Sequence, residues 1–478
     1  MNSSQTLQIR RLNGSTAESQ AAFADDLHAL RTSLSPSGNV VSPRGQELTR
    51  RVFGEPLLPS QVVERICNDV KARGLTALLH YSQQLDGSAR PAELSAGSLR
   101  LPESQLAEAH AQADPEFLRA IARIRGNIES FQRSILHRSV TCQPAAGVQL
   151  DQRYVPLRRI GVCVPGGAAA YPSTVLMTVV PAQVAGVEEI ALVAPPTEFG
   201  AYNRDVLATC YELGVREVYP VGGAQAVAAL AYGVDGLPAV DKIVGPGNLF
   251  VALAKKFVYG DVDIDSIAGP SEVVVIADDS TDPAFTAADM LAQAEHSPGS
   301  SVLVTWDASL ADRVEAELNR QLASLSRRDL TVDSLNAFGA FVLVRDRQQA
   351  CTVTDLIAPE HLHIACRQPR ELSQQIQNAG ATFLGPYSPV ALGDYAAGPS
   401  HVLPTGGTAR WAAGLSANSF LRSGSVIEYS QAALADITAE ISLLANKEGL
   451  TAHRHSVEIR NQSKRSQPQS MPPSTDYF

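Results

Sequence analysis

The chain has 478 residues, of which 45% are hydrophobic and 18% charged, and its formal net charge is −10 at pH 7. This length is enough for two or three domains with apolar cores of their own, and the acidic balance argues against a nucleic-acid-binding protein, which would carry a basic patch. The six cysteines form no Cys-x-x-Cys pair, which fits a reducing compartment better than a disulfide scaffold.

No segment reaches the ~18 unbroken apolar residues of a membrane span. The first 20 residues also lack the apolar core of a secretory signal. We therefore expect a cytoplasmic protein without a membrane or nucleic-acid partner.

The two ends of the chain differ from its middle. Residues 1–45 are polar and rich in Ser and Gly, which predicts a flexible extension with one short helix around Ala21–Leu34. Residues 461–478 are rich in Pro and Ser and predict a disordered tail. Between about 55 and 140, apolar residues recur every three or four positions, which indicates helices.

From Arg159 onward, short apolar runs alternate with helix-like stretches. IGVCVPGG, EEIALVAPP, REVYPVGG and DKIVGPGN are typical of strands that end in turns, and the stretches between them are typical of helices. A Gly/Pro break at Ala268–Pro270 follows, and the pattern resumes with SEVVVIAD, SSVLVTWD and AFVLVRD. The sequence thus predicts an α/β fold with two incomplete Rossmann-like parallel-sheet domains and small helical extensions at the N- and C-terminal ends.

Glycine-rich turns follow most of the predicted strands, at residues 165–167, 222–223, 245–248 and 269–271. Glycine lets backbone N–H groups approach a phosphate closely, and ligands bind at the carboxyl ends of parallel strands. The same residues also make tight turns without any ligand, and no complete GxGxxG is present. The turns alone leave both interpretations open.

Four side chains are candidate metal ligands. Gln293 and His296 are three residues apart on a predicted helix and so share one face. Asp394 stands in a Gly-flanked turn, and His453 stands in the late segment LTAHRHS. A nitrogen and oxygen donor set of this kind suits zinc, but a solvated helix end or a capping carboxylate would explain each residue equally well.

Glu360 and His361 are a candidate acid–base pair in the segment APEHLHI. A histidine of near-neutral pKa is a natural base for an alcohol proton, and a glutamate can activate water. The alternative is that Glu360 only begins a helix, where the dipole favours a carboxylate.

These residues lie in long motifs that resemble the histidinol dehydrogenase family over about Pro59 to Arg460. The motifs are GGAQAVAALAYG, VDKIVGPGN, IDSIAGPSEVVVIAD, LAQAEH, APEHLHI, FLGPYSPVALGDYAAGPSHVLPTGGTAR and EGLTAHRHSVEIR, in this order.

The resemblance implies oxidation of L-histidinol to L-histidine through L-histidinaldehyde in two NAD-dependent steps, the last step of histidine biosynthesis. It implies one zinc ion per subunit, which orients the substrate, and a homodimer with shared active sites. His361 would take the alcohol proton and Glu360 would activate water. The implied zinc ligands are Gln293, His296, Asp394 and His453, the last from the partner subunit. The implied substrate contacts are these four residues with Glu360, His361, Ser271, His401 and Glu448, and the implied NAD contacts are Cys163, Gln225 and Asn248.

The resemblance also implies a division into domains. We expect a catalytic and zinc-binding domain from residues 46–158 plus 271–415, an NAD-binding domain from 159–270, and a dimerisation segment from 416–460.

Two positions depart from the family pattern and keep other functions open. Cys163 stands where relatives often carry a tyrosine that contacts the dinucleotide, and Ser400 stands where an asparagine is usual. A related dehydrogenase could act on another small primary alcohol, such as a hydroxylated sulfonate, on the same scaffold. A non-catalytic zinc-binding homologue is the alternative from another class, but it would be expected to lose Glu360, His361 or a ligand.

Overall fold

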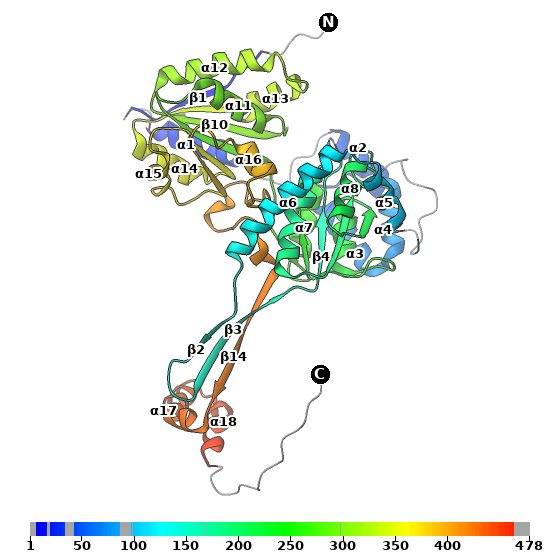
Figure 1. Cartoon of the computed structure of the whole chain (residues 1–478), viewed down its shortest axis with the longest axis vertical. Coiled ribbons are helices and arrows are strands. Elements are labelled where there is room, and N and C mark those ends of the chain that lie inside the picture. Colours follow the sequence, from blue (N-terminus) through cyan, green and yellow to red (C-terminus); the bar gives the residue numbers. More distant parts are fainter. Residues whose placement is uncertain are drawn as a thin grey trace. The chain divides into compact units, whose positions relative to one another are not determined.

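The structure is a computed structural model that describes residues 6–16, 20–33, 43–86, 97, 99–167, 169–296 and 298–462 (Figure 1). The chain forms two units. The first comprises Met1–Leu136 and Pro156–Phe420, and the second comprises His137–Val155 and Leu421–Phe478. No helix among the described residues is long and apolar enough to cross a membrane.

The first unit contains two parallel sheets, as the alternating pattern predicts. One sheet has the strand order β6-β5-β4-β7-β8, so the chain starts in the middle and the strand order reverses between β4 and β7. Apolar residues dominate its three central strands because helices cover both faces. The strands are β4 (Arg159–Cys163), β5 (Glu189–Ala194), β6 (Glu217–Pro220), β7 (Lys242–Val244) and β8 (Asp263–Ile264), and the connecting helices are α7 (Pro172–Ala185), α8 (Arg204–Glu212), α9 (Gly223–Tyr232) and α10 (Leu249–Val258).

The N-terminal helices pack against this same sheet. Val62 and Ile66 of α3 share one core with Val227 and Leu230 of α9. This differs from the expected division, which grouped residues 46–158 with 271–415, because a helical period reveals which face is apolar but not which sheet it covers. The helices are α2 (Pro43–Phe53), α3 (Pro59–Arg73), α4 (Leu75–Leu85), α5 (Glu103–Ala111) and α6 (Pro115–Ile135).

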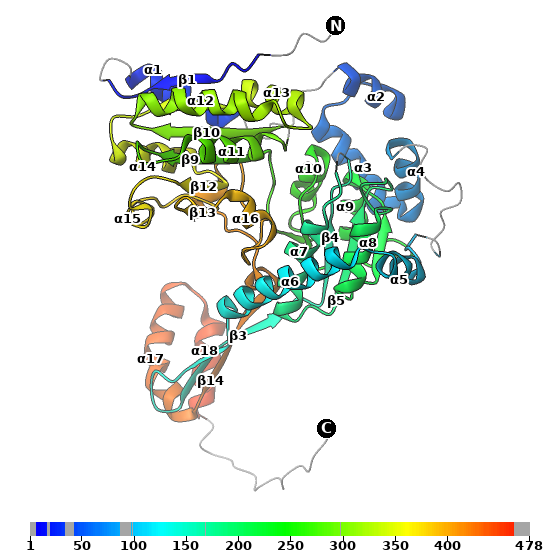
Figure 2. The same cartoon turned by 45° about the horizontal axis from the view of Figure 1, so that its top comes forward.

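The other sheet of the first unit has the strand order β1-β11-β10-β9-β12-β13 (Figure 2). One apolar core lies between the sheet and α11, α12 and α13, and another lies between the sheet and α1 and α14. The strands are β1 (Arg10–Asn13), β9 (Ser271–Ala277), β10 (Gly299–Thr305), β11 (Ala340–Leu343), β12 (His361–Ile364) and β13 (Ala381–Leu384). The helices are α1 (Gln20–Ser33), α11 (Pro283–Ala294), α12 (Ala308–Leu322), α13 (Arg328–Phe338), α14 (Arg347–Ile357), α15 (Pro369–Ser373) and α16 (Val390–Tyr395), followed by the 3₁₀ turns η3 (Thr408–Arg410) and η4 (Ala417–Phe420).

The N-terminal segment is part of this sheet rather than a flexible extension. Strand β1 pairs in parallel with β11, and Leu12 is buried. Arg11 forms ion pairs with Asp312 and Glu315 of α12. The expected short helix around Ala21–Leu34 is confirmed as α1, Gln20–Ser33. The expected extension missed β1, because four residues of strand are too few for an alternating pattern to stand out in a polar sequence.

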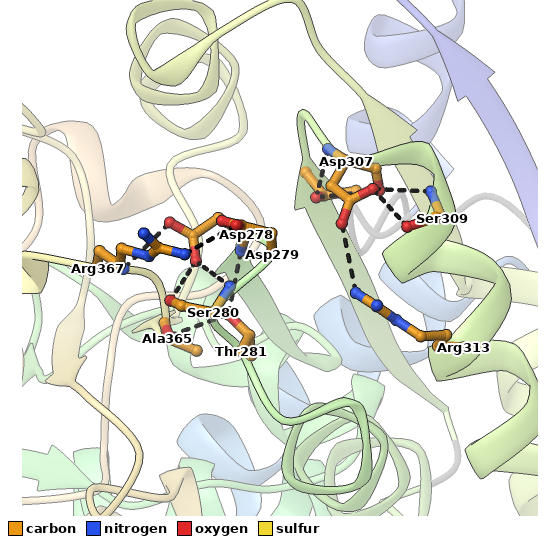
Figure 3. A network of polar contacts seen from close by, with 10 residues as sticks. Asp278, Asp279, Ser280, Thr281, Asp307, Ser309, Arg313, Ala365 and Arg367 are labelled. Carbon is orange, nitrogen blue, oxygen red and sulfur yellow. Dashed lines mark hydrogen bonds and ion pairs between the residues drawn. The ribbon is translucent and has the colours of Figure 1, made fainter.

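The carboxyl ends of the two sheets differ in chemistry. At the sheet of β9, Asp278 accepts hydrogen bonds from Ser280 and from the Arg367 backbone, and Asp307 contacts Arg313 (Figure 3). These carboxylates are held by neighbouring side chains and would repel a phosphate. At the sheet of β4 the turns carry glycines instead, which leave room for a backbone N–H to approach a phosphate.

The second unit contains a three-stranded sheet in the order β14-β3-β2 and two helices. Ser430 caps α17 by accepting from the Ala433 N–H. Leu443 and Leu444 of α17 are exposed, at 60% and 63%. The elements are β2 (Val140–Cys142), β3 (Val148–Pro156), β14 (Leu421–Tyr429), α17 (Gln431–Lys447) and α18 (Thr451–Gln462). The expected dimerisation segment thus shares its unit with residues 137–155, and the expected tail lies outside the described residues from 463 onward.

Candidate active site

The predicted acid–base pair lies where strands β9 and β12 begin. The two strands are parallel neighbours, with His361 in register with Val273. Ser271 and Glu272 of β9 therefore lie beside Glu360 and His361. This is the amino end of the strands, whereas ligands of open parallel sheets usually bind at the carboxyl end.

Glu360 is buried, and its carboxylate is held on one side. Its Oε2 accepts from Ser271 Oγ at 2.5 Å and from the Glu272 backbone N–H at 2.9 Å. Burial raises the pKa of Glu360 above its usual range, against the opposing effect of the nearby His361 charge. The carboxyl group is thus poised to take up a proton.

His361 lies between two carboxylates. Its Nδ1 is 3.2 Å from the Glu272 carbonyl oxygen and 3.5 Å from Glu360 Oε2, and its Nε2 is 3.6 Å from Asp394 Oδ1. Burial disfavours the charged ring, but the two carboxylates outweigh it and raise the pKa of His361 to about 9. Because a carbonyl can only accept, Nδ1 carries the hydrogen, and Nε2 is the proton acceptor of the neutral ring.

A cavity of about 210 Å³ within the first unit connects these groups. It is lined from one sheet by Pro165 and Pro246 and from the other by Ser271, Glu360 and His361. An adjoining cavity of about 530 Å³ shares His361 with it. A small polar substrate would reach both predicted catalytic groups from this space.

Three of the four predicted metal ligands belong to this unit. His296 and Asp394 line the 210 Å³ cavity. Burial raises the pKa of Asp394, but the neighbouring His361 lowers it. The net pKa is below its usual value, which keeps the carboxylate ionised. Gln293 is 3% exposed, and its Nε2 has no hydrogen-bond partner, which is unusual for a buried amide.

The chemistry of this donor set fits zinc. One imidazole, one carboxylate and one carboxamide supply nitrogen and oxygen donors. Among the described residues, no three His, Cys, Asp or Glu side chains are already grouped to hold a metal. The predicted set has only two such side chains in the first unit, His296 and Asp394.

The predicted substrate contacts are divided between the two units. His401 lines both cavities, and its Nδ1 is 2.9 Å from the Asp394 carbonyl oxygen. Ser400 holds this segment, since its Oγ donates to the Met177 carbonyl at 2.8 Å. Glu448 and His453 belong to the second unit and are exposed, so their part in the site stays a prediction.

The three predicted NAD contacts lie in different surroundings. Cys163 and Asn248 line a cavity of about 150 Å³ formed by the glycine turns of the first sheet. The Asn248 side chain also caps α10, because its Oδ1 accepts from the Phe250 and Val251 N–H groups. Gln225 is buried and does not line this cavity. Its Nε2 donates to Asp86 at 3.4 Å, and its Oε1 lies against Gly223, which does line the cavity.

Comparison with known proteins identifies the family. The sequence model described as histidinol dehydrogenase matches residues 58–461. The chain is 64% identical over 444 residues to histidinol dehydrogenase of Rhodopirellula baltica, covering 93% of this chain and 96% of that protein.

The chain belongs to the histidinol dehydrogenase family.

Two more distant members agree with this assignment. Histidinol dehydrogenase of a Synechococcus strain is 46% identical over 84% of this chain and 92% of its own length. The crystal structure of histidinol dehydrogenase from Elizabethkingia anophelis is 30% identical and superposes with a TM-score of 0.84, covering 97% of this chain and 100% of that one. The α/β fold predicted from the sequence is therefore confirmed as the histidinol dehydrogenase fold.

The sequence did not predict two of the residues at the site, Glu272 and Thr405. Glu272 is a buried acid in the otherwise apolar strand β9, and a charge in a buried strand is a detectable signal. Thr405 accepts a hydrogen bond from the Gly269 backbone at 2.6 Å, and nothing in the sequence distinguishes it from an ordinary loop residue.

Proposed function

We propose that this protein oxidises L-histidinol to L-histidine through L-histidinaldehyde, in two successive NAD-dependent steps that complete histidine biosynthesis. The observation that carries the proposal is the grouping of Glu360 and His361 with His296, Asp394 and His401 around one cavity. Family membership supports the choice of substrate.

In the first oxidation, His361 acts as the general base in its neutral form, which gains population as pH rises toward its pKa of about 9. Its Nδ1–H is directed to the Glu272 carbonyl, which leaves Nε2 to take the hydroxyl proton of the substrate. Asp394 lies on the Nε2 side and stabilises the imidazolium that results.

In the second oxidation, Glu360 activates the water that attacks the aldehyde. Its Oε2 is occupied by Ser271 and the Glu272 N–H, so Oε1 is the oxygen that takes the proton from water. The raised pKa of Glu360 suits this uptake.

The zinc ion would be held by Gln293, His296, Asp394 and His453 of the partner subunit. When bound, it supplies a template that orients the substrate. His401 and Glu448 would contact the substrate directly. The protein would then be a homodimer with active sites shared between subunits, and we place it in the cytoplasm.

The dinucleotide would bind at the glycine-lined cavity next to Cys163 and Asn248, because glycine lets backbone N–H groups approach a phosphate closely. When bound, NAD would supply the hydride acceptor, one molecule for each oxidation. Gln225 fits this role less directly, because it is buried and does not line the cavity.

The test is the number of NADH molecules formed per L-histidinol, with and without a zinc chelator. We expect two NADH per substrate, loss of activity with chelator, and recovery with added zinc. A folded, zinc-loaded protein that did not turn over L-histidinol would contradict the proposal and direct attention to other small primary alcohols.

A further inference from the structure

The Glu272 side chain has no role in the chemistry proposed above, although the Glu272 backbone contacts both catalytic residues. It is the second residue of β9 and is 4% exposed. Its backbone N–H donates to Glu360 Oε2 at 2.9 Å, and its carbonyl accepts from His361 Nδ1 at 3.2 Å. All of its backbone polar groups are thus directed to the acid–base pair.

The Glu272 side chain completes a reciprocal contact. Its Oε1 accepts from the Glu360 backbone N–H at 3.2 Å, while the Glu360 carboxylate accepts from the Glu272 backbone N–H. The same Oε1 accepts from the Gly406 N–H at 3.0 Å. The carboxylate of Glu272 therefore connects the start of β9 to Glu360, just before β12, and to Gly406 in the turn that follows Thr405.

Such a group is expensive to bury. Burial and the negative charge of Glu360 raise the pKa of Glu272 to about 8. The rest of the strand, from Val273 to Ala277, is apolar, and an apolar residue at position 272 would avoid the desolvation of a carboxyl group. The hydrogen bonds that the carboxyl group accepts from the Glu360 and Gly406 backbone N–H groups therefore explain its presence at this position.

We propose that Glu272 is a positioning residue that orients Glu360 for the second oxidation. This inference rests on the proposed function. Substitution of the side chain leaves the carbonyl that orients His361, but it removes the acceptor of the Glu360 N–H. Loss of the side chain therefore disturbs water activation by Glu360 more than proton uptake by His361.

The experiment measures the two oxidations separately, with L-histidinol or L-histidinaldehyde as the substrate. Glu272→Ala is expected to lower kcat for the aldehyde about 100-fold, as misplacement of a catalytic group by ~1 Å does, and to lower kcat for the alcohol step much less. Glu272→Gln keeps an Oε1 acceptor in place and is expected to restore most of the aldehyde activity. If Glu272→Ala does not fold, Glu272→Asp replaces it in the test. It withdraws the carboxylate by one methylene and is expected to give a milder form of the same effect.

Val275→Ala is the matched control, because Val275 is buried in the same strand and is in register with His363 rather than with Glu360. It should lower stability without changing the ratio of the two activities. Equal losses of both activities in Glu272→Ala, or the same shifted ratio in Val275→Ala, would overturn the positioning role. A wild-type protein that formed no NADH from L-histidinaldehyde would instead contradict the proposed function, and the role of Glu272 with it.

Discussion

Single buried residues around the site are held by partners on neighbouring helices and strand ends. His363, two residues after the predicted base, has both ring nitrogens near acceptors. Its Nδ1 lies 2.7 Å from Asp289 Oδ2, and its Nε2 lies 2.9 Å from the Gly385 carbonyl oxygen. Asp289 is on α11, the helix that carries Gln293, so this contact ties the predicted zinc-binding helix to β12.

The contact of His363 makes stability depend on pH. Burial lowers the pKa of His363, but Asp289 and the Gly385 carbonyl outweigh it and raise the pKa above its usual value. A pKa raised in the folded state adds stability that is full below the unfolded pKa of about 6.5 and is lost as pH rises through the folded pKa. We expect His363→Gln to reduce the free energy of unfolding more at about pH 6 than at about pH 9.

Denaturant titration of the wild type and of His363→Gln over this pH range checks the prediction. Asp289→Asn should remove the same pH-dependent part, because it removes the partner of the imidazolium. A constant difference between wild type and variant at all pH values would mean that the ring is neutral in the folded protein.

At the scale of elements, a buried ion pair binds both backbone groups of Gly245 in the turn between β7 and α10. Lys255 and Asp265 are each 2% exposed and contact one another. Lys255 Nζ donates to the Gly245 carbonyl at 3.0 Å, and Asp265 Oδ2 accepts from the Gly245 N–H at 2.7 Å. A Cβ on Gly245 would lie 2.2 Å from the Cys163 carbonyl oxygen, so only glycine fits here.

We expect Asp265→Asn to lower stability by about 3–5 kcal/mol, because it leaves a buried lysine without its counter-charge. If the glycine turns bind NAD, the variant should also raise the KM for NAD more than it lowers kcat. Asp261→Asn is the control, since Asp261 forms an exposed pair with Lys71 and should change neither quantity appreciably. An unchanged KM for NAD in a destabilised Asp265→Asn protein would argue against a cofactor site at this turn.

Strand β1 is a second element whose contribution can be measured. Leu12 is 4% exposed in the core between the sheet, α1 and α14. Leu12→Ala is therefore expected to cost about 2–5 kcal/mol, the range for a truncated core leucine. Leu330→Ala, at a position that is 47% exposed, should have a much smaller effect in the same denaturant titration. Equal effects of the two substitutions would mean that the N-terminal segment is dispensable for the fold.

At the scale of the whole molecule, the proposed homodimer makes a prediction about mixed subunits. If His453 completes the site of the partner subunit, His453→Ala and His361→Ala proteins are each inactive. Unfolding and refolding the two together would form heterodimers with one intact site, and about a quarter of the wild-type activity would return.

The readout is NADH formation by the mixture compared with each parent alone. Recovery would require that His361 and His453 of one site come from different subunits. If the mixture stayed as inactive as its parents while sedimentation showed dimers, each site would be built from a single chain.

The sequence by itself determined what depends on local burial and turn chemistry. Alternating apolar runs predicted two parallel sheets, because a strand covered on both faces must be apolar. Glycines after the strands predicted the turns next to Cys163 and Asn248. The spacing of Gln293 and His296 predicted one helix for both, but α11 ends at Ala294, so only Gln293 is on the helix and His296 follows its C-terminus. The motifs around Glu360, His361 and Asp394 carried the resemblance to the family.

Only the tertiary structure decided what depends on contacts between distant segments. Helix α3 covers the first sheet rather than the second, since a helical period does not specify its partner. Strand β1 pairs with β11 at the edge of the sheet, and the pattern of four residues is too short to predict this pairing. Glu272 and Glu360 are 88 residues apart, and the parallel register of β9 and β12 alone brings their carboxylates and backbone N–H groups together.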